Sequence, residues 1–167
     1  GQQLLSHLAL QADGKIILLG SFGLADGFPS SKICRINPDG SFDSGYSVGV
    51  GFDGQAIIHC AQIIANDFLL VSGSFSSFDG APARAMLKIN PNGLIDNTFN
   101  HSFGAGSFIN SFASNGTKIF AQGHFSNSGV YNGAKMVCLN LSGSIDNSFA
   151  PGQVHSIKSI GFTNDGI

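Results

Sequence analysis

The chain has 167 residues, of which 11% are charged and 43% are hydrophobic, and its formal net charge is −2. Ordinary soluble domains carry about 25% charged residues, so this composition favours packed strands and turns over a highly charged surface. The sequence has no basic stripe, which makes nucleic acid and anionic membrane surfaces poor partners on electrostatic grounds. We also expect no membrane insertion, because no window reaches the roughly 18 consecutive apolar residues of a membrane span.

The sequence repeats one pattern three times. Each copy has a glycine triplet, Gly-Ser-Phe or Gly-His-Phe, followed by a turn rich in Asn and Gly and then by an aspartate. The triplets begin at Gly20, Gly73 and Gly123 and the aspartates are Asp43, Asp96 and Asp146, so both markers are spaced by 53 and then 50 residues. Length changes are confined to Gly-marked turns, as surface loops on a fixed scaffold allow. The chain is therefore one repeat array.

Four short strands are predicted in each copy. In the first copy, the first strand covers residues 6–11 and meets Asp13-Gly14, a pair that signals a hairpin. The second strand covers residues 15–22 and is largely apolar on both faces, as expected for a strand between neighbouring sheets. The glycine at its sixth position suits a close backbone approach or a bulge. This strand has equivalents at 68–75 and 118–125.

The third strand covers residues 31–37 in the first copy, with equivalents at 85–90 and 135–140. The Asn-Pro-Asp-Gly stretch that follows predicts a tight reversal, because Pro fixes φ and Gly accepts the left-handed conformation. A short fourth strand then follows, at 41–46, 94–99 and 144–149. The sequence shows no amphipathic helical run, so it predicts an all-β fold.

Tandem four-stranded antiparallel units of about 50 residues are typical of β-propeller blades. We predict one array, with blade 1 at 1–53, blade 2 at 54–103, blade 3 at 104–152 and the first strand of the next blade at 153–167. Propellers typically close with roughly four to eight blades, so three blades make an incomplete ring. We expect further blades of the same chain, or another copy of it, to close the ring. A stacked β-solenoid, which needs no closure, is the alternative.

Several stretches of the first copy resemble the delta-60 repeat, a family regarded as propeller-forming. The resemblance rests on Ala9-Leu10-Gln11-Ala12-Asp13-Gly14-Lys15-Ile16, Gly20-Ser21-Phe22, Gly27, Arg35-Ile36-Asn37 and Asp39-Gly40-Ser41-Phe42-Asp43. The second copy departs from the pattern at residues 65–68 and the third has an extra Thr117, so their first hairpins are expected to differ. The resemblance implies a scaffold without catalytic residues, of the kind found in large secreted or surface bacterial proteins and in some phage structural proteins.

Residues 39–43 and their copies place two oxygen-bearing side chains four residues apart around a glycine, which suggests calcium. Calcium takes about six to eight oxygen ligands, and the third copy has Ser142 at the first of the two positions. The other interpretation is that Asp43, Asp96 and Asp146 accept hydrogen bonds from backbone N–H groups of the following turn. The sequence leaves calcium binding by these turns open. We predict no catalytic residue, cofactor-binding residue or metal ligand.

The remaining chemically interesting residues have structural explanations. The histidines His7, His59, His101, His124 and His155 form no spaced ligand pair, although His7 and His59 both lie on predicted inner strands. Cys34, Cys60 and Cys138 follow no disulfide or zinc pattern and are expected to be small buried side chains. Residues 49–51 and 104–106 resemble phosphate loops but lack the lysine and the helix, which favours linkers between blades. Phe22, Phe75 and Phe125 recur at one strand position and are expected in the core.

These observations favour a non-catalytic structural or adhesion scaffold that binds protein or glycan through the variable loops 23–30, 76–83 and 126–133. We expect it to be part of a larger surface or secreted bacterial protein, located outside the cell or on its surface, or else of a virion appendage. The alternative is a propeller hydrolase or lyase with an axial site that uses His7 and His59. The ligand, the total number of blades and the oligomeric state are left open by the sequence.

Overall fold

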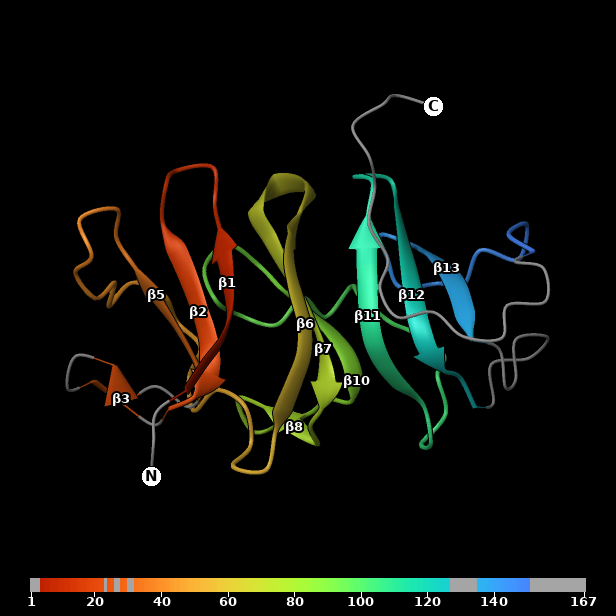
Figure 1. The fold of residues 1–167 in the computed structure, drawn as a ribbon, viewed down its shortest axis with the longest axis horizontal. Helices are drawn as coiled ribbons and strands as arrows, with labels where there is room; N and C mark the ends of the chain where they lie inside the picture. The colour runs from red at the N-terminus through yellow and green to blue at the C-terminus, as the bar shows by residue number, and fades with distance from the viewer. Residues whose placement is uncertain (1–3, 23, 26–27, 30–31, 127–134, 151–167) are drawn as a thin grey trace. The chain divides into compact units, whose positions relative to one another are not determined.

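A computed structural model describes residues 4–22, 24–25, 28–29, 32–126 and 135–150 (Figure 1). The predicted strand at 153–167, the loop 126–133 from residue 127 onward, and His155 lie outside the described residues. The elements run β1 (Leu4–Leu10), β2 (Ile16–Ser21), β3 (Leu24–Ala25), β4 (Phe28–Pro29), β5 (Ile33–Ile36), β6 (Ile57–Ile64), η1 (Ala65–Asp67), β7 (Phe68–Ser74), β8 (Ser77–Phe78), β9 (Ala81–Pro82), β10 (Ala85–Ile89), β11 (Phe108–Ser114), β12 (Lys118–His124) and β13 (Met136–Asn140). Apart from the single 3₁₀ turn η1, every one of these elements is a strand.

Each repeat forms one antiparallel sheet with its second strand in the middle. The strand orders are β1-β2-β5, β6-β7-β10 and β11-β12-β13, and all neighbouring strands are antiparallel. The predicted all-β class and the first three strands of each repeat are therefore confirmed. No helix within the described part of the chain has the length and apolar character needed to cross a membrane.

The fourth strand of each repeat is shorter than predicted. It pairs with the third strand through one bridge in each copy: Ile36 with Phe42, Ile89 with Ile95, and Leu139 with Ile145. In the first copy two flanking bonds support this bridge, since Asn37 N donates to Ser41 O at 2.8 Å and Asp43 N donates to Arg35 O at 3.0 Å. The pairing ends at Asp43, because its carboxylate accepts a bond from Gly45 N at 2.9 Å and turns the chain.

The glycine of each triplet faces a bulge in the first strand. Strand pairing shifts register between Leu5 and His7 in β1, between Ile58 and Cys60 in β6, and between Ile109 and Ser111 in β11. A Cβ atom on Gly20, Gly73 or Gly123 would collide with the carbonyl oxygen of Leu4, Ile57 or Phe108, respectively. The predicted close approach and bulge thus both occur, and the triplet begins with glycine because no side chain fits there.

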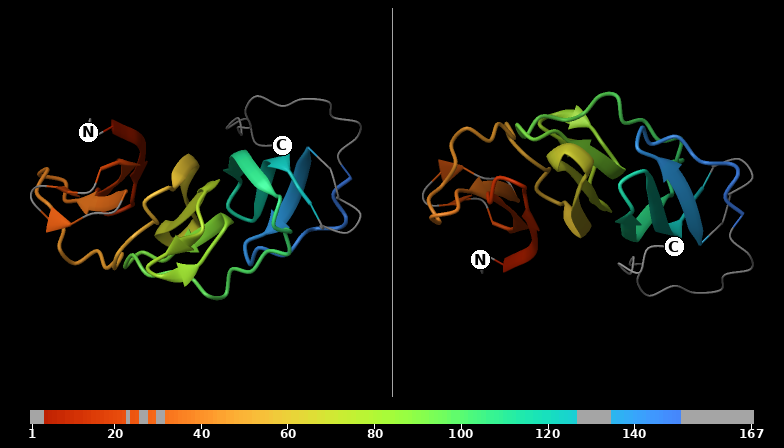
Figure 2. Two further views of the ribbon diagram at one scale, coloured as in Figure 1. Left: turned by 90° about the horizontal axis from the view of Figure 1, so that it is seen from below. Right: turned by 90° about the horizontal axis from the view of Figure 1, so that it is seen from above.

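The chain forms two compact units, Gly1–Asp96 and Asn97–Ile167. In the first unit the sheets β1-β2-β5 and β6-β7-β10 pack face to face, and β6 lies beside β1 (Figure 2). The first sheet contributes Ala9, Ile17, Leu19 and Ile33 to the shared core, and the second contributes Leu69, Val71, Leu87 and Ile89. This packing explains the two-sided apolar character of the second strand, since one of its faces meets the next sheet.

The second unit contains the sheet β11-β12-β13. Ile119, Val137 and Leu139 on this sheet are fully buried. Phe103, from the preceding linker, packs against Phe125 with 4.9 Å between ring centroids. An equivalent contact in the first unit joins Phe52 and Phe75 at 5.1 Å.

We predict that Gly73→Ala lowers the free energy of unfolding by about 1–3 kcal/mol, because the added methyl group must displace the backbone of the bulge. Gly54→Ala is the matched control, since a Cβ on Gly54 meets nothing within 4 Å. Urea unfolding followed by circular dichroism measures both effects. Equal midpoints for the two variants would contradict the steric role of the bulge.

Candidate functional site

The repeated aspartates each bind a basic side chain. Asp43 Oδ2 lies 2.9 Å from Lys15 Nζ, Asp96 Oδ2 lies 2.9 Å from Lys88 Nζ, and Asp146 Oδ2 lies 2.8 Å from Lys118 Nζ. The other oxygen serves the turn, as predicted: Asp43 Oδ1 accepts from Gly45 N at 2.9 Å, and Asp146 Oδ1 accepts from Ser148 N at 3.0 Å. Sequence reasoning found the turn contact but missed the cation.

The cation comes from two different strand positions. In the first repeat both positions are basic, with Lys15 before β2 and Arg35 in β5, and both bind Asp43. The second repeat has Phe68 and Lys88 at these positions, and Lys88 takes the aspartate while lying 4.2 Å from the centre of the Phe68 ring. The third repeat has Lys118 and Cys138, and there Lys118 takes the aspartate. Every repeat therefore keeps at least one cation for its aspartate, from one or both of these positions.

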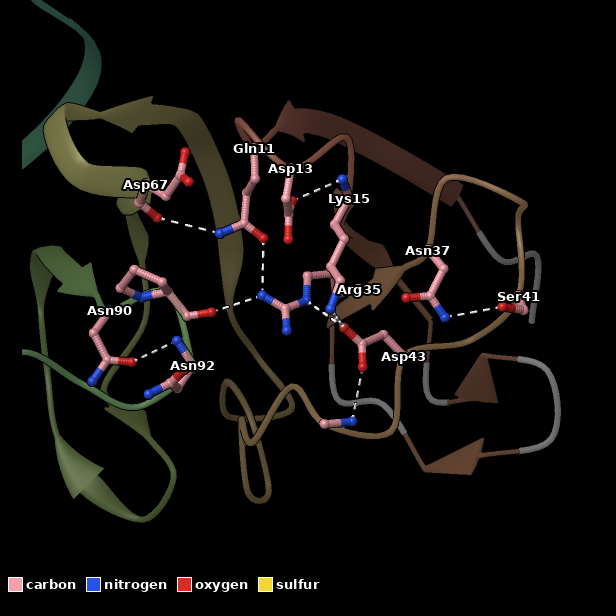
Figure 3. Close-up of polar contacts among 12 residues, drawn as sticks. Gln11, Asp13, Lys15, Arg35, Asn37, Ser41, Asp43, Asp67, Asn90 and Asn92 are labelled. Atoms are coloured by element: carbon pink, nitrogen blue, oxygen red, sulfur yellow. Dashed lines mark hydrogen bonds and ion pairs between the residues drawn. The ribbon is translucent and has the colours of Figure 1, made fainter.

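Arg35 connects the first two sheets (Figure 3). It is 7% exposed, and its guanidinium lies 4.4 Å from the centre of the Tyr46 ring. Arg35 Nε donates to Asp43 Oδ2 at 2.8 Å, while Nη1 donates to Gln11 Oε1 at 2.9 Å and to Pro91 O of the second repeat at 2.7 Å. These contacts stabilise the buried charge and fix the turn of the second repeat against the first sheet.

The surroundings of these aspartates keep them ionised. Burial acts to raise the pKa of Asp43, but the hydrogen bonds from Lys15, Gly45 and Arg35 and the charge of Arg35 outweigh it, so this pKa lies below its ordinary value of 3.8. The hydrogen bond from Lys118, with those from Ser148, lowers the pKa of Asp146 to about 2. Both carboxylates are therefore strong, fully charged acceptors at neutral pH.

The contacts of the carboxylate oxygens in these turns favour hydrogen bonding over calcium coordination. Asp39 Oδ1 accepts from Ser41 N at 3.0 Å and from Ser41 Oγ at 2.7 Å, and Asp43 is held by two cations. A calcium ion at Asp43 would have to displace both basic groups. Across the described ranges, His, Cys, Asp and Glu side chains do not gather in groups of three or more that suit a metal ion.

The structure brings His7 and His59 together. His7 Nε2 lies 3.2 Å from the carbonyl oxygen of His59, and His7 Nδ1 lies 3.0 Å from Ser6 Oγ. His59 Nε2 lies 3.4 Å from Ser74 Oγ. These contacts orient the His7 ring between Ser6 and the backbone of β6. The other described histidines, His101 and His124, stack on Phe103 and Phe108 in the second unit.

The remaining predicted structural residues behave mostly as expected. Cys34 and Cys138 are buried. Burial raises the pKa of the Cys34 thiol to about 11 and also raises the pKa of the Cys138 thiol, so both thiols stay protonated and unreactive at neutral pH. Cys60 is only half-buried. Phe75 and Phe125 are core residues, whereas Phe22 is half-buried. Residues 49–51 and 104–106 lie in the connections between sheets, as predicted.

The segment between the second and third strands is a small hairpin, which sequence reasoning treated as a loop. In the second repeat, β8 and β9 are joined by Asp79 and Gly80, with φ angles of 48° and 74°. Two positive φ angles are typical of the type I′ hairpin turn. In the first repeat β3 and β4 pair in the same way, and Figure 1 shows β3 and β8 at the same end of their sheets.

The hairpin β8–β9 is anchored at its base and exposed at its tip. Asp53 Oδ2, from the linker that precedes β6, accepts from Ser76 N at 2.6 Å and from Ser77 N at 3.1 Å. Phe78 is fully buried and packs against Phe52 at 4.9 Å between ring centroids. By contrast, residues 79–82 at the tip are all exposed. The hairpin therefore presents a small surface segment on a rigid support.

A hollow of about 230 Å³ lies nearby in the first unit, lined among others by Arg35, Asp43, Tyr46 and Val48. Its two charged side chains bind each other at 2.8 Å. Tyr46 Oη is buried, and no hydrogen-bond partner for it is found in the part of the chain that the structure describes. The hollow thus presents no unpaired charge.

These observations together define the class of protein. Antiparallel sheets of a roughly 50-residue repeat, with short connections and face-to-face packing, are the elements of a β-propeller. The described residues contain three such three-stranded sheets. A family model described as "domain of unknown function (DUF5122) beta-propeller" matches residues 11–46, 69–99 and 118–149, more than half of the chain.

The chain therefore belongs to the DUF5122 β-propeller family. The matched segments begin at the first hairpin or the second strand of each repeat and end after its aspartate, so they contain the turn and the ion pair described above. Neither the curated proteins nor the solved structures gave a match to this chain.

We predict that Asp43→Asn lowers the free energy of unfolding by on the order of 3 kcal/mol, because it leaves the buried Arg35 guanidinium without its counter-charge. Asp13→Asn is the control: Asp13 is exposed and bonds only its own turn, so a change of about 0.5 kcal/mol or less is expected. Urea unfolding compares the two. An equal loss in both variants would contradict the role assigned to the Asp43 cluster.

Acid is expected to destabilise the fold between about pH 4 and pH 2. The pKa values of Asp43, Asp53 and Asp146 are lowered in the folded chain, so the unfolded chain binds more protons in this window. Their stabilising contribution is complete above the ordinary pKa of 3.8 and is lost as the pH falls through the folded pKa, about 2 for Asp146. Urea midpoints at pH 6, 4, 3 and 2 measure the loss, which Asp43→Asn should reduce. A pH-independent midpoint would contradict this linkage.

Proposed function

We propose that this chain is a non-catalytic structural or adhesion scaffold that binds protein or glycan through the hairpin tips at one end of its sheets. The observation that carries the proposal is the contrast between the two kinds of residue in the repeat. Those that recur have structural partners, whereas residues 79–82 at the tip of the second hairpin are exposed, and the loops 23–30, 76–83 and 126–133 differ in sequence.

The recurring residues support a scaffold. The triplet glycines face the bulges, and the aspartates bind a cation. A set of side chains that is already engaged in this way offers little to a substrate. Binding is therefore assigned to the segments that vary on a fixed framework, as in other loop-bearing scaffolds.

The hairpin β8–β9 supplies the clearest recognition segment. Asp79 is fixed through its Oδ1 atom, which accepts from Val50 N at 3.0 Å, and this leaves the neighbouring Ala81 and Pro82 exposed. A rigid, partly apolar tip loses little conformational entropy on binding. The loops 23–30 and 126–133 of the other repeats are the corresponding candidate segments.

A propeller hydrolase or lyase is less well supported. It would use His7 and His59, which do lie together, but neither histidine recurs at its position in the other copies of the repeat. We therefore propose a role in binding, without cofactor, rather than in catalysis.

The setting we propose is outside the cell, on a surface or secreted bacterial protein, with a phage virion as the alternative. Support comes from the resemblance to delta-60 repeats, which occur in such proteins, and from a composition low in charge and rich in turns. Further blades of the same chain, or another copy of it, would complete the ring.

The test is binding of the chain to a glycan array and to immobilised whole bacterial cells. Pro82→Glu is expected to weaken binding at least tenfold, because it adds a charge to the partly apolar tip. Thr117→Glu is the matched control: it places the same charge on the exposed turn between β11 and β12, outside the hairpin segments. Unchanged binding by Pro82→Glu, or absence of binding by the parent chain, would refute the proposal.

A further inference from the structure

We propose that the hollow in the first unit binds a single neutral sugar ring, with the Tyr46 hydroxyl and the Arg35 guanidinium as its hydrogen-bonding groups. The hollow has a volume of about 230 Å³, and both side chains line it. The site is separate from the hairpin tip, because none of residues 79–82 lines the hollow. It would add a small-molecule site to the scaffold proposed above.

The Tyr46 hydroxyl is a buried polar group that packing leaves without a bond. Tyr46 is 6% exposed, and its Oη finds no hydrogen-bond partner within the described residues. An unpaired polar group in the interior costs free energy, because it gives up its hydrogen bonds to water. Buried polar groups in folded proteins are therefore nearly always paired, and a partner for Tyr46 has to come from outside the described chain.

The other copies of the repeat show that packing at this position requires the ring and not the hydroxyl. Tyr46 follows Asp43 by three residues, and the equivalent residues of the second and third copies are Phe99 and Phe149. Both phenylalanines are half-buried. The first copy thus differs from the others by one oxygen atom at this position, and that atom lies in a side chain that lines the hollow.

Arg35 supplies a second group with bonding capacity to spare. Its hydrogen bonds to Asp43, Gln11 and Pro91 use only Nε and Nη1, as Figure 3 shows. Nη2 has no hydrogen-bond partner in the part of the chain that the structure describes. The guanidinium lies 4.4 Å from the centre of the Tyr46 ring, so the two groups belong to neighbouring side chains of one hollow.

The charges around the hollow favour a neutral ligand. Arg35 and Asp43 are the charged residues of the lining, and they bind each other at 2.8 Å. An anion would therefore compete with Asp43 for the guanidinium, whereas a ligand hydroxyl can accept from Nη2 and leave the ion pair intact. Lys15 also binds Asp43 from outside the lining, so acetate is included below as an anionic probe.

The rest of the lining combines apolar and hydroxyl-bearing side chains. Ile33, Phe42 and Val48 supply apolar surface, and the exposed Ser44 and Ser47 supply hydroxyls. A sugar ring has the same two features, with C–H groups on its faces and hydroxyls around its edge. Pockets for drug-sized ligands measure about 300–1,000 Å³, so this smaller hollow suits one ring.

Saturation-transfer NMR and titration calorimetry with D-glucose, D-galactose and acetate test the site on the full chain. At least one hexose is expected to bind, with a dissociation constant of about 1 mM for so small a ligand. Tyr46→Phe is expected to weaken this binding about tenfold, because it removes one hydrogen bond and keeps the ring. The urea midpoint of Tyr46→Phe should equal or exceed that of the parent, since a buried unpaired hydroxyl is lost.

Ser72→Ala is the matched control for Tyr46→Phe. Ser72 is also fully buried, its Oγ likewise has no partner among the described residues, and it does not line the hollow. Hexose binding by Ser72→Ala should therefore equal that of the parent. Pro82→Glu should also bind hexose normally, which separates this site from the hairpin tip.

A second pair of variants tests the hollow without touching the buried tyrosine. Ser44→Phe is expected to obstruct the hollow and abolish hexose binding, whereas Gln55→Phe places the same ring on an exposed residue outside the lining and should have no effect. Absence of binding by both hexoses, binding of acetate alone, or unchanged binding by Tyr46→Phe or Ser44→Phe would each overturn the proposal. A urea midpoint lowered by Tyr46→Phe would do so too, because the hydroxyl would then serve the fold through a bound water.

Discussion

The sheets of this chain are apolar on both faces, and this constraint underlies the whole architecture. In β7, Leu69 and Val71 point to one side and Leu70 and Ser72 to the other, and all four are fully buried. A three-stranded sheet has too little area to form a core alone, so each repeat is stable only when neighbours cover it. Tandem repetition is therefore the condition for folding. It also explains why the apolar positions within each strand keep the same spacing in every copy, while the turns between strands change length.

The aspartate and its cation fix the part of the repeat that apolar packing does not define. Hydrophobic contact is non-directional, whereas the Asp43 carboxylate joins β5, the residue before β2 and the turn at Gly45 with three directed bonds. A buried pair of this kind adds little net stability, because desolvation opposes the attraction. Its value is geometric: it sets where the short fourth strand ends and where the linker leaves toward the next sheet.

Much of the fold could be predicted from local patterns. The alternation of β2, the Asp13-Gly14 hairpin and the bulge opposite Gly20 each depend on residues that are near in sequence or paired in one sheet. The altered second hairpin was expected as well, and it proved to be the 3₁₀ turn η1 with positive φ at Asn66 and Asp67. In all these places the backbone conformation is dictated by residue type, so the sequence carries the information directly.

Other features depend on partners that are distant in sequence, and these were missed. The cation that binds each aspartate comes from different positions in different repeats, so no single position is basic in all three copies. In the second copy, Phe68 stands where the other copies have lysine, and Lys88 binds the aspartate instead. The two-residue strands β8 and β9 are held by Asp53, which lies more than twenty residues earlier in the linker. Strands this short have no periodicity to detect. Their order comes from tertiary contacts alone, as does the burial of Phe78 against Phe52.

The two ends of a sheet differ in how many contacts their residues make with the neighbouring repeat. At one end, the first hairpin, the Asn turn and the aspartate are tied to the neighbouring repeat, as when Arg35 donates to Pro91 O and Ser47 to Asn92 O. A change there disturbs two repeats at once. At the other end of the second sheet, Asp53, Phe52 and Asp79 hold the hairpin, while Gly80, Ala81 and Pro82 at its tip are exposed. The three copies of the repeat therefore differ most where a change alters the surface and not the core.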